Sequence, residues 1–110
     1  MKIRNILKTY RNSRIDIDIN ELKEIINENE EAILLDVRSP LEFKEGHLKN
    51  AINIPLYDLE SCCNYKIKDK YKIIIVYCQS GIRSKKGVKI LYKNGYKNLY
   101  HLKGGLDNIN

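Results

Sequence analysis

The sequence contains no long apolar run, which argues against a protein that crosses a membrane. A membrane-spanning helix needs about 20 consecutive apolar residues, and no stretch of the 110 residues approaches that length. The first residues are basic but lack the apolar core of a secretory signal, so we expect a cytoplasmic protein with no membrane span. Internal repeats and low-complexity segments are also missing, and the chain length predicts one compact domain.

Cysteine is scarce, with only three residues in the chain, and two of them, Cys62 and Cys63, are adjacent. Adjacent cysteines rarely bridge each other, because disulfide geometry strains a two-residue span. We therefore expect reduced thiols, as is usual in the cytosol, and no disulfide framework. No spacing of histidine, cysteine and carboxylate residues is typical of a zinc site, so no bound metal is expected.

Acidic residues are missing from the first 14 positions. Residues 1–14 carry five basic side chains, which account for most of the formal net charge of +6. The rest of the chain is nearly neutral, whereas a nucleic-acid-binding domain would carry a basic face across its fold, so no nucleic-acid partner is expected. We interpret residues 1–14 as a basic N-terminal helix or arm and residues 15–110 as the folded domain. Contact of this arm with an acidic partner or an anionic lipid surface is the alternative.

Short apolar runs alternate with segments of helical spacing across residues 15–110. The expected strands cover residues 15–17, 32–35, 51–54, 72–77 and 98–102. The expected helices cover residues 19–29, 40–44 and 56–62, and a segment after residue 84 that ends at residue 94. Asp18 and Glu21 form a capping-box pattern at the start of the first helix. This alternation predicts an α/β sandwich around a mainly parallel sheet, in which ligands bind beyond the carboxyl ends of the strands.

Cys78 lies between the most apolar strand, at 72–77, and the helix that follows it. The unpaired N–H groups and the partial positive charge of a helix N-terminus favour an anion, so this position is expected to lower the pKa of the cysteine. Gly81 lets the loop curl until successive amides point inward and form an anion-binding nest. Arg83 is expected to add a fixed positive charge at the rim. Cys78 is therefore the predicted nucleophile.

Such a cradle stabilises a thiolate, a persulfide, or an oxyanion of sulfur, phosphorus or arsenic. The charge and the amides of the loop do not distinguish among these anions. The length of the loop is more selective. Four residues separate Cys78 from Arg83, one fewer than in the signature of protein-tyrosine phosphatases. The tighter ring favours a sulfane sulfur over a phosphoryl group.

Several segments of the chain, in register with this loop, resemble the rhodanese family. They are Leu35-Asp36-Val37-Arg38 with Glu42-Phe43 and Gly46-His47-Leu48, then Ala51-Ile52-Asn53-Ile54-Pro55, Val76 to Ser84, and Leu102-Lys103-Gly104-Gly105. The resemblance covers residues 15–109 and implies a rhodanese-like three-layer α/β sandwich with a mainly parallel central sheet. One turn departs from the family pattern, because Asn50 stands where a glycine is common.

The resemblance also implies a sulfurtransferase reaction. The Cys78 thiolate would take a sulfane sulfur from a small donor such as thiosulfate, hold it as a persulfide, and pass it to cyanide or a thiol. Loop amides would stabilise the charge, without a metal or an organic cofactor. A sulfur-relay protein is a further implied partner. Two alternatives stay open: a persulfide carrier or sulfur sensor that acts only with a protein partner, and a phosphatase or arsenate reductase of the same fold.

The loop and the resemblance together predict one site. It consists of the nucleophile Cys78, the binding-loop residues Gln79, Ser80, Gly81, Ile82 and Arg83, and the supporting residues Asp36 and Arg38. The supporting pair is expected to hold the scaffold through hydrogen bonds and ion pairs, with Glu45 as a further partner, and to take no part in the chemistry. Gln79, Ser80 and Ile82 are expected to shape the mouth of the pocket, and Ser84 to cap the following helix.

The other chemically capable side chains are interpreted as structural. His47 belongs to a turn segment of the family pattern, and His101 is interpreted as a strand residue. Cys62 and Cys63 are interpreted as ordinary helix residues, and the alternative is that one of them resolves an oxidised Cys78 as a disulfide.

Overall fold

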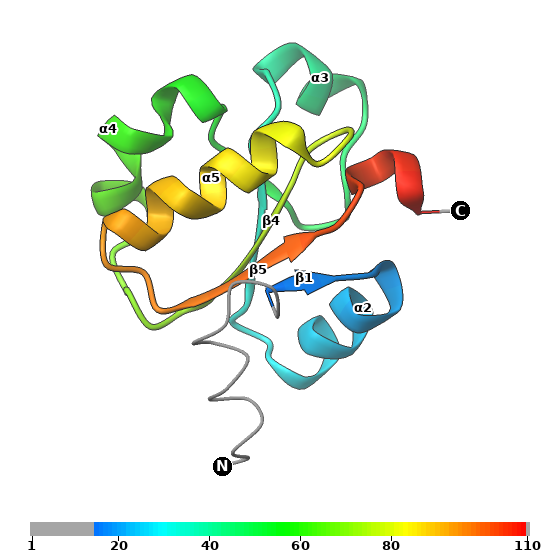
Figure 1. Ribbon diagram of the computed structural model, residues 1–110, viewed down its shortest axis with the longest axis horizontal. Coiled ribbons are helices and arrows are strands. Elements are labelled where there is room, and N and C mark those ends of the chain that lie inside the picture. The colour runs from blue at the N-terminus through cyan, green and yellow to red at the C-terminus, as the bar shows by residue number, and fades with distance from the viewer. Residues whose placement is uncertain (1–14, 110) are drawn as a thin grey trace.

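The computed structural model describes residues 15–109, so the expected arm at residues 1–14 lies outside the described residues. Within that range five strands form one sheet in the order β1-β5-β4-β2-β3, and every neighbouring pair is parallel. The strands are β1 (Asp16–Ile17), β2 (Ile33–Asp36), β3 (Ile52–Asn53), β4 (Ile73–Tyr77) and β5 (Asn98–Leu102). The predicted parallel sheet is confirmed, with β4 at its centre (Figure 1).

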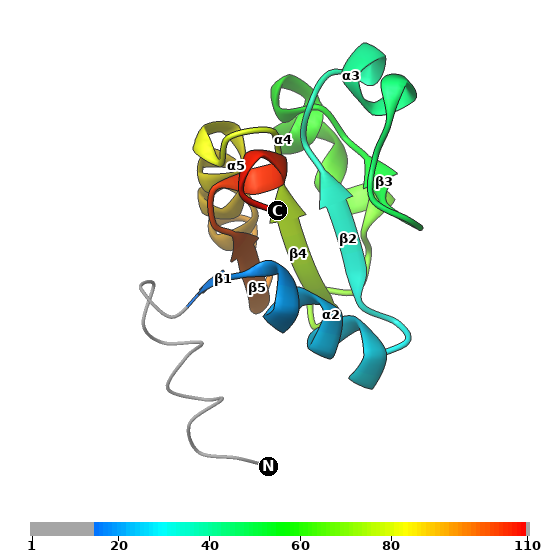
Figure 2. The same ribbon diagram turned by 90° about the vertical axis from the view of Figure 1, so that its right-hand side faces the viewer.

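Helices cover both faces of this sheet. They are α2 (Ile19–Glu28), α3 (Pro40–Glu45), α4 (Leu56–Lys66), α5 (Ile82–Lys93) and the 3₁₀ helix η2 (Gly105–Asn108). α2 packs on one face, while α4 and α5 lie together over the other (Figures 1 and 2). This arrangement is the expected three-layer sandwich. No helix in the described part of the chain is long and apolar enough to cross a membrane.

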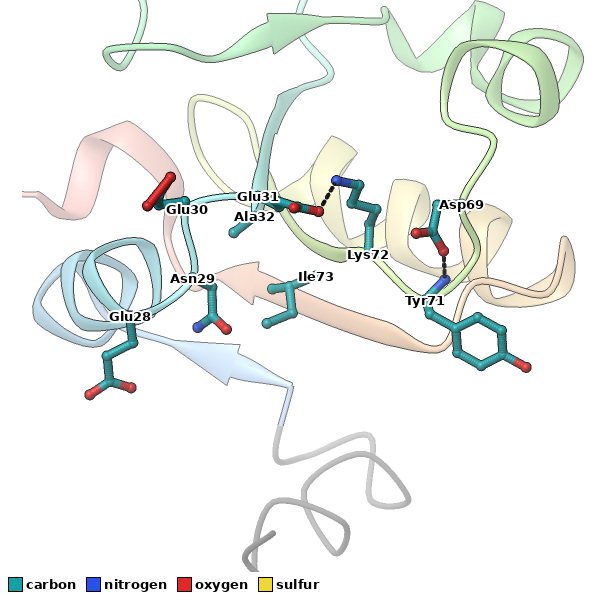
Figure 3. Close-up of a pocket in the computed structure, with 9 residues that line it drawn as sticks. All are labelled: Glu28, Asn29, Glu30, Glu31, Ala32, Asp69, Tyr71, Lys72 and Ile73. Atoms are coloured by element: carbon teal, nitrogen blue, oxygen red, sulfur yellow. Dashed lines mark hydrogen bonds and ion pairs between the residues drawn. The ribbon is translucent and has the colours of Figure 1, made fainter.

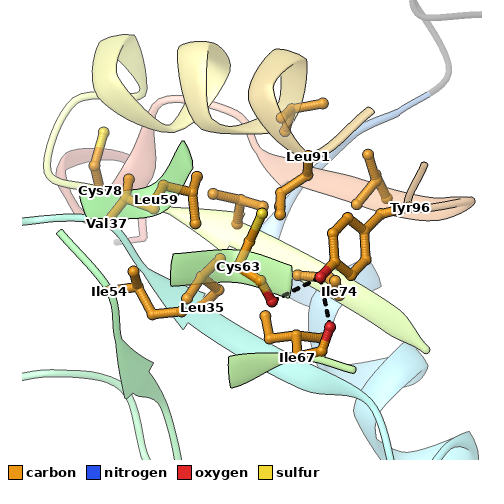
Figure 4. Packing of buried hydrophobic residues seen from close by; sticks show 13 residues of the cluster. Leu35, Val37, Ile54, Leu59, Cys63, Ile67, Ile74, Cys78, Leu91 and Tyr96 are labelled. Atoms are coloured by element: carbon orange, nitrogen blue, oxygen red, sulfur yellow. Dashed lines mark hydrogen bonds between the residues drawn. The ribbon is translucent and has the colours of Figure 1, made fainter. Parts of the chain in front are cut away.

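The sheet buries alternate side chains on its two faces, as a parallel sheet covered on both sides requires. Leu34 of β2 packs in the cluster under α2, whereas its neighbour Leu35 packs in the cluster under α4 and α5. Figure 4 shows this second cluster, where the hydroxyl of Tyr96 donates a hydrogen bond of 2.7 Å to the carbonyl oxygen of Cys63. Cys78 belongs to the same cluster, so the predicted nucleophile is anchored in the core.

The predicted element boundaries hold where the local pattern is strong. Asp18 and Glu21 form the predicted capping box, in which each side chain accepts a hydrogen bond from the backbone N–H of the other. The helix predicted at residues 56–62 is about one turn longer, because fully buried Cys63 extends its inner face toward the core. Asn50 adopts a left-handed φ of 65°, so it supplies the backbone conformation that explains glycine at this turn in the family.

The carboxyl ends of the strands meet at one edge of the sheet, where α3 and η2 also lie (Figure 2). The register of β2 against β4 places Asp36 opposite Tyr77, and β5 runs beside β4 in the same direction. The chain therefore brings segments 36–46, 78–84 and 101–107 together. This is the edge at which the sequence predicts the ligand site.

Candidate active site

The side chain of Cys78 is fully buried just beyond the carboxyl end of β4. Its Sγ accepts hydrogen bonds from the backbone N–H of Gly81, at 3.1 Å, and from that of Ser84, at 3.3 Å. The Oγ atom of Ser84 lies 3.4 Å from the same sulfur. Donors from the first turn of α5 thus converge on one sulfur atom, which is the cradle that the sequence predicts.

Gly81 sets the shape of this loop. It adopts a φ of +100° at the N-cap of α5, a left-handed conformation that favours glycine. A Cβ at this position would lie 3.2 Å from the backbone nitrogen of Gly104, so a side chain would also crowd the neighbouring turn. The predicted capping role of Ser84 is wrong, because α5 has no side-chain cap and the Ser84 hydroxyl lies against the Gly81 carbonyl and Cys78 instead.

The donors around Sγ decide how easily Cys78 ionises. Burial by itself raises the pKa of the thiol, because a less polar environment disfavours the charged form. Hydrogen bonds from the Ser84 hydroxyl and from the backbone N–H groups of Ser84, Gly81 and Arg83 favour the thiolate. Together they outweigh burial and lower the pKa of Cys78. The site therefore holds a cysteine that is shielded from water and still biased toward its nucleophilic form.

The η2 turn packs against the other side of the loop. The backbone N–H of Leu106 donates to the carbonyl oxygen of Cys78 at 3.0 Å, and that of Asp107 donates to the carbonyl oxygen of Gln79 at 2.9 Å. The side-chain amide of Gln79 also donates to Asp107 Oδ1 at 2.7 Å. Because the loop carbonyls are held by η2, the loop amides are left to face Sγ.

Arg83 lies at the rim of the loop, as predicted, but its guanidinium is already paired. It donates hydrogen bonds of 2.7 and 2.9 Å to the two carboxylate oxygens of Glu42 in α3. These bonds, together with the bond from the Ser39 backbone, lower the pKa of Glu42 to about 2, and the carboxylate in turn raises the pKa of Arg83. The predicted role of Arg83 as an anion ligand stays a prediction, with Glu42 as a partner that sequence reasoning did not identify.

Asp36 and Arg38 form a buried ion pair beside the loop. The guanidinium donates to Asp36 Oδ2 at 2.8 Å through Nη2 and to Asp36 Oδ1 at 3.1 Å through Nε. Nη2 of Arg38 also donates to the Gly46 carbonyl at 2.6 Å, so the structure shows this carbonyl, rather than the expected Glu45, as the further partner. The pair connects the end of β2 to the turn after α3.

A further polar side chain at the site, that of His101, was not identified from the sequence. His101, interpreted above as a strand residue, has its Nε2 atom 2.7 Å from the Oγ of Ser84 and its Nδ1 atom 3.0 Å from the Oδ1 of Asp16. The parallel register of β1 against β5 places Asp16 opposite His101. A histidine near the carboxyl end of a predicted strand was the available signal. Only the pairing of β1 with β5 brings it to Asp16, and only the position of α5 beside β5 brings it to Ser84.

The remaining thiols and the second histidine lie in structural surroundings. Cys63 is fully buried in the core, and Cys62 is half-buried with its sulfur accepting a hydrogen bond from the Tyr65 hydroxyl. All three cysteines of the chain are free. The ring of His47 stacks on Phe43 with centroids 3.7 Å apart, and its Nδ1 lies 2.7 Å from the Phe43 carbonyl oxygen. This geometry agrees with the structural interpretation of His47.

An open hollow of about 550 Å³ lies at the opposite edge of the sheet (Figure 3). Residues 28–32 line it together with Asp69, Tyr71, Lys72 and Ile73, at the amino ends of β2 and β4. Its lining is largely polar and includes Lys72, which pairs with Glu31 at 2.6 Å. The length of the sheet separates this hollow from Cys78, so it does not belong to the cysteine site.

The fold and the site define a class of protein: a parallel α/β domain with a cysteine held by inward-pointing amides at the carboxyl edge of its sheet. The chain belongs to the Rhodanese-like domain family, whose sequence model matches residues 18–110. This match confirms the resemblance described above. It also confirms the predicted fold class.

Two curated proteins that resemble this chain are a tRNA uridine(34) hydroxylase and the protein YqhL. The chain is 34% identical over 110 residues to a tRNA uridine(34) hydroxylase of Buchnera aphidicola, an alignment that covers 93% of this chain and 32% of the relative. It is 45% identical over 74 residues to the protein YqhL of Bacillus subtilis, covering 67% of this chain and 57% of that protein. The chain thus spans about a third of the length of this hydroxylase.

A solved structure agrees with the fold. A rhodanese from E. coli, solved with anions, superposes with a TM-score of 0.64 at 33% sequence identity. The alignment covers 71% of this chain and 91% of that chain. The likeness therefore includes nearly the whole of a rhodanese.

Proposed function

We propose that this chain moves sulfane sulfur through a persulfide on Cys78. The observation that carries the proposal is the convergence of the backbone N–H groups of Gly81 and Ser84 on one buried sulfur atom, with the Ser84 Oγ 3.4 Å from the same atom. Preorganised donors of this kind stabilise an anionic sulfur without reorganisation when the reaction occurs. They serve a thiolate before the transfer and a persulfide after it.

The proposed reaction is a pair of displacements at sulfur. The Cys78 thiolate attacks the outer sulfur of a donor such as thiosulfate, the sulfur–sulfur bond of the donor breaks, and sulfite leaves with the bonding electron pair. A nucleophilic acceptor, such as cyanide or a thiol, then attacks the outer sulfur of the persulfide. The Cys78 thiolate leaves and is regenerated. No electron is gained or lost overall, so no redox cofactor enters the proposal.

The size of the loop supports sulfur over phosphate as the transferred group. Four residues separate Cys78 from Arg83, and the guanidinium of Arg83 is bound to Glu42 through both Nη1 and Nη2. A phosphoryl group brings several charged oxygens that need a free cation or more amides. The phosphatase and arsenate reductase alternatives are therefore less well supported than a single sulfane sulfur.

A second candidate function rests on the relatives. The hydroxylase of Buchnera aphidicola is named for a tRNA uridine, and its 34% identity extends over 93% of this chain. The chain would then act in tRNA modification, with the tRNA held by residues 1–14 or by a partner, since residues 15–110 are nearly neutral. Binding of unfractionated tRNA at low salt that is lost at high salt would support this candidate. The expectation of no nucleic-acid partner stays a prediction.

The test of the sulfur proposal is the intact mass of the reduced protein before and after incubation with thiosulfate. Wild type is expected to gain one sulfur atom, which cyanide then releases as thiocyanate. Cys78→Ala should gain none. Cys62→Ala is the matched control, because it removes a half-buried thiol that lacks the amide cradle, and it should load sulfur like wild type.

A wild type that gains no sulfur would contradict turnover with small donors. Sulfur loading from a persulfide-bearing protein would then identify a partner-dependent carrier. Turnover of an aryl phosphate would instead revive the phosphatase alternative. Sulfur on the Cys78→Ala variant would mean that Cys78 does not carry the transferred sulfur.

A further inference from the structure

A continuous chain of polar atoms leads from the sulfur of Cys78 to a carboxylate on β1. The Ser84 Oγ lies 3.4 Å from Cys78 Sγ and 2.7 Å from His101 Nε2. On the far side of the ring, Nδ1 lies 3.0 Å from Asp16 Oδ1. Ser84 and Cys78 are fully buried, and His101 is 6% exposed, so the chain is shielded from water up to the side chain of Asp16, which is half-exposed.

The atoms around His101 fix where its protons can be. The Asp16 carboxylate opposite Nδ1 can only accept a hydrogen bond, so Nδ1 carries a proton. The carbonyl oxygen of Gly81 lies 3.1 Å from Nε2 and also can only accept. Of the two Nε2 partners, only the Ser84 hydroxyl can either donate or accept. The surroundings thus accommodate a proton on both ring nitrogens.

We propose that Ser84, His101 and Asp16 form a proton relay that removes the thiol proton of Cys78 and holds it on His101 while the sulfur is a thiolate. In this relay Ser84 is a catalytic residue, since it contacts the reacting sulfur. His101 acts through Ser84, and Asp16 orients the ring, so both are positioning residues. The inference deepens the proposed function, on which it rests only through the reactivity of Cys78.

The proton steps balance without an external base. The Ser84 hydroxyl has two acceptors within reach, the Gly81 carbonyl oxygen at 3.2 Å and His101 Nε2 at 2.7 Å. In the relay, the S–H of Cys78 points to Ser84 Oγ before activation, the Ser84 O–H turns to the nearer Nε2, and Nδ1–H points to Asp16. Activation breaks the S–H bond as a new O–H bond forms on Ser84, and breaks the former O–H bond as an N–H bond forms at Nε2. The products are a thiolate and an imidazolium, and no proton leaves the protein. The new Ser84 hydroxyl proton then points back to the thiolate.

The charges on the surrounding elements favour this separation. Against His101 lie β1, which contributes Asp16, β4, which contributes Val76 at the paired position, and the start of α5. α5 carries Arg83, but the guanidinium is balanced by Glu42, and the lysines of its first two turns are exposed. The carboxylate of Asp16 is therefore the charge in direct contact with the ring, and it lies against Nδ1.

The test measures thiolate formation directly, as the ultraviolet absorbance of the thiolate across pH, after subtraction of the Cys78→Ala spectrum. Ser84→Ala and His101→Gln are each expected to raise the midpoint by about one pH unit, because each removes a link worth about a tenfold change in proton affinity. Asp16→Asn should shift it in the same direction by less, since the amide oxygen still accepts from Nδ1. His47→Gln removes the other histidine, which is not connected to Cys78, and should leave the midpoint unchanged.

The double variant Ser84→Ala/His101→Gln separates a relay from two independent structural roles. A relay predicts a shift no larger than that of Ser84→Ala alone, because both changes cut the same chain. Two shifts that add, or a His101→Gln midpoint equal to that of wild type, would overturn the proposal. His101 would then be a hydrogen-bonding partner of the loop and nothing more.

A measurement on the imidazole ring of His101 in wild type tests the relay even if the His101→Gln variant does not fold. The ¹⁵N spectrum of the ring in wild type is expected to show protons on both nitrogens at a pH where Cys78 is a thiolate. Cys78→Ser, whose hydroxyl does not ionise, should lose one of them at that pH. Identical ring spectra in the two proteins would overturn the relay. Neither readout uses a sulfur donor, so failure of sulfur transfer and failure of the relay are distinguishable.

Discussion

Replacement of Gly105 by alanine tests whether the η2 turn shapes the cysteine loop. Gly105 adopts a φ of +61°, and a Cβ at this position would lie 2.6 Å from the carbonyl oxygen of Gln79 and closer still to that of Cys78. Both contacts are with backbone atoms, which cannot move aside as a flexible side chain can. The Gly105→Ala variant must therefore displace either η2 or the loop.

The expected cost has two parts. An alanine in the left-handed region costs about 1–2 kcal/mol. Displacement of η2 from the loop also breaks the hydrogen bonds from Leu106 to Cys78 and from Asp107 to Gln79, each worth about 1 kcal/mol net. We therefore expect Gly105→Ala to lower the free energy of unfolding by about 3–4 kcal/mol.

Gly95 provides the matched control. It also has a positive φ, of +92°, but a Cβ there would meet no atom within 4 Å. Gly95→Ala should therefore show only the backbone cost of about 1–2 kcal/mol. Urea unfolding followed by circular dichroism gives both values. In addition, Gly105→Ala should raise the pKa of Cys78, because a shifted loop no longer directs its amides at Sγ, whereas Gly95→Ala should not.

Equal losses of stability in the two alanine variants would contradict a tight contact between η2 and the loop. A Gly105→Ala variant that kept the wild-type thiolate midpoint while losing about 3 kcal/mol would contradict a role of η2 in shaping the loop. The first result would mean that η2 and the loop move apart with no loss in the free energy of unfolding. The second would mean that the loop shape does not depend on η2.

Two further predictions concern the ion pairs of the site. Glu42→Gln should cost less than about 1 kcal/mol at neutral pH, because the pair with Arg83 is partly exposed. Since the pKa of Glu42 is lowered to about 2, this contribution is present above pH ~4 and is lost as the pH falls toward 2, so urea unfolding curves of variant and wild type should converge there. Asp36→Asn should cost about 3 kcal/mol, because it leaves the buried guanidinium of Arg38 without its counter-charge. Glu31→Gln, which removes an exposed pair, is the control and should cost less than about 1 kcal/mol in the same assay.

Much of the fold could be predicted because its signals are local. The β-branched run of β4 marks a central strand, and the predicted strand at residues 98–102 matches β5. The capping box of Asp18 and Glu21 depends on residues three positions apart, so the sequence alone indicates it. Cys78 was predictable for the same reason: the strand, the nucleophile, the glycine and the helix follow one another directly.

The polar chain behind Cys78 could not be predicted, because its members are far apart in sequence. Asp16 and His101 are 85 positions apart and meet only through the pairing of β1 with β5. The sequence predicts Ser84 to be a helix cap, because serine near the start of a helix usually is one. Its hydroxyl points inward because its position on the first turn of α5 faces the sheet. Glu42 was missed likewise, as a helix residue with no local sign of a partner 41 positions away.

The attachment of η2 to the loop makes the reactivity of Cys78 a property of the finished domain. The groups that surround the sulfur come from β1, β5, the start of α5 and the turn after β5, so no fragment of the chain assembles them. In a partly folded chain the same cysteine has the ordinary pKa of about 8.5 and is mostly a thiol at neutral pH. Thiolate formation at Cys78 is, in effect, a chemical reporter that folding is complete.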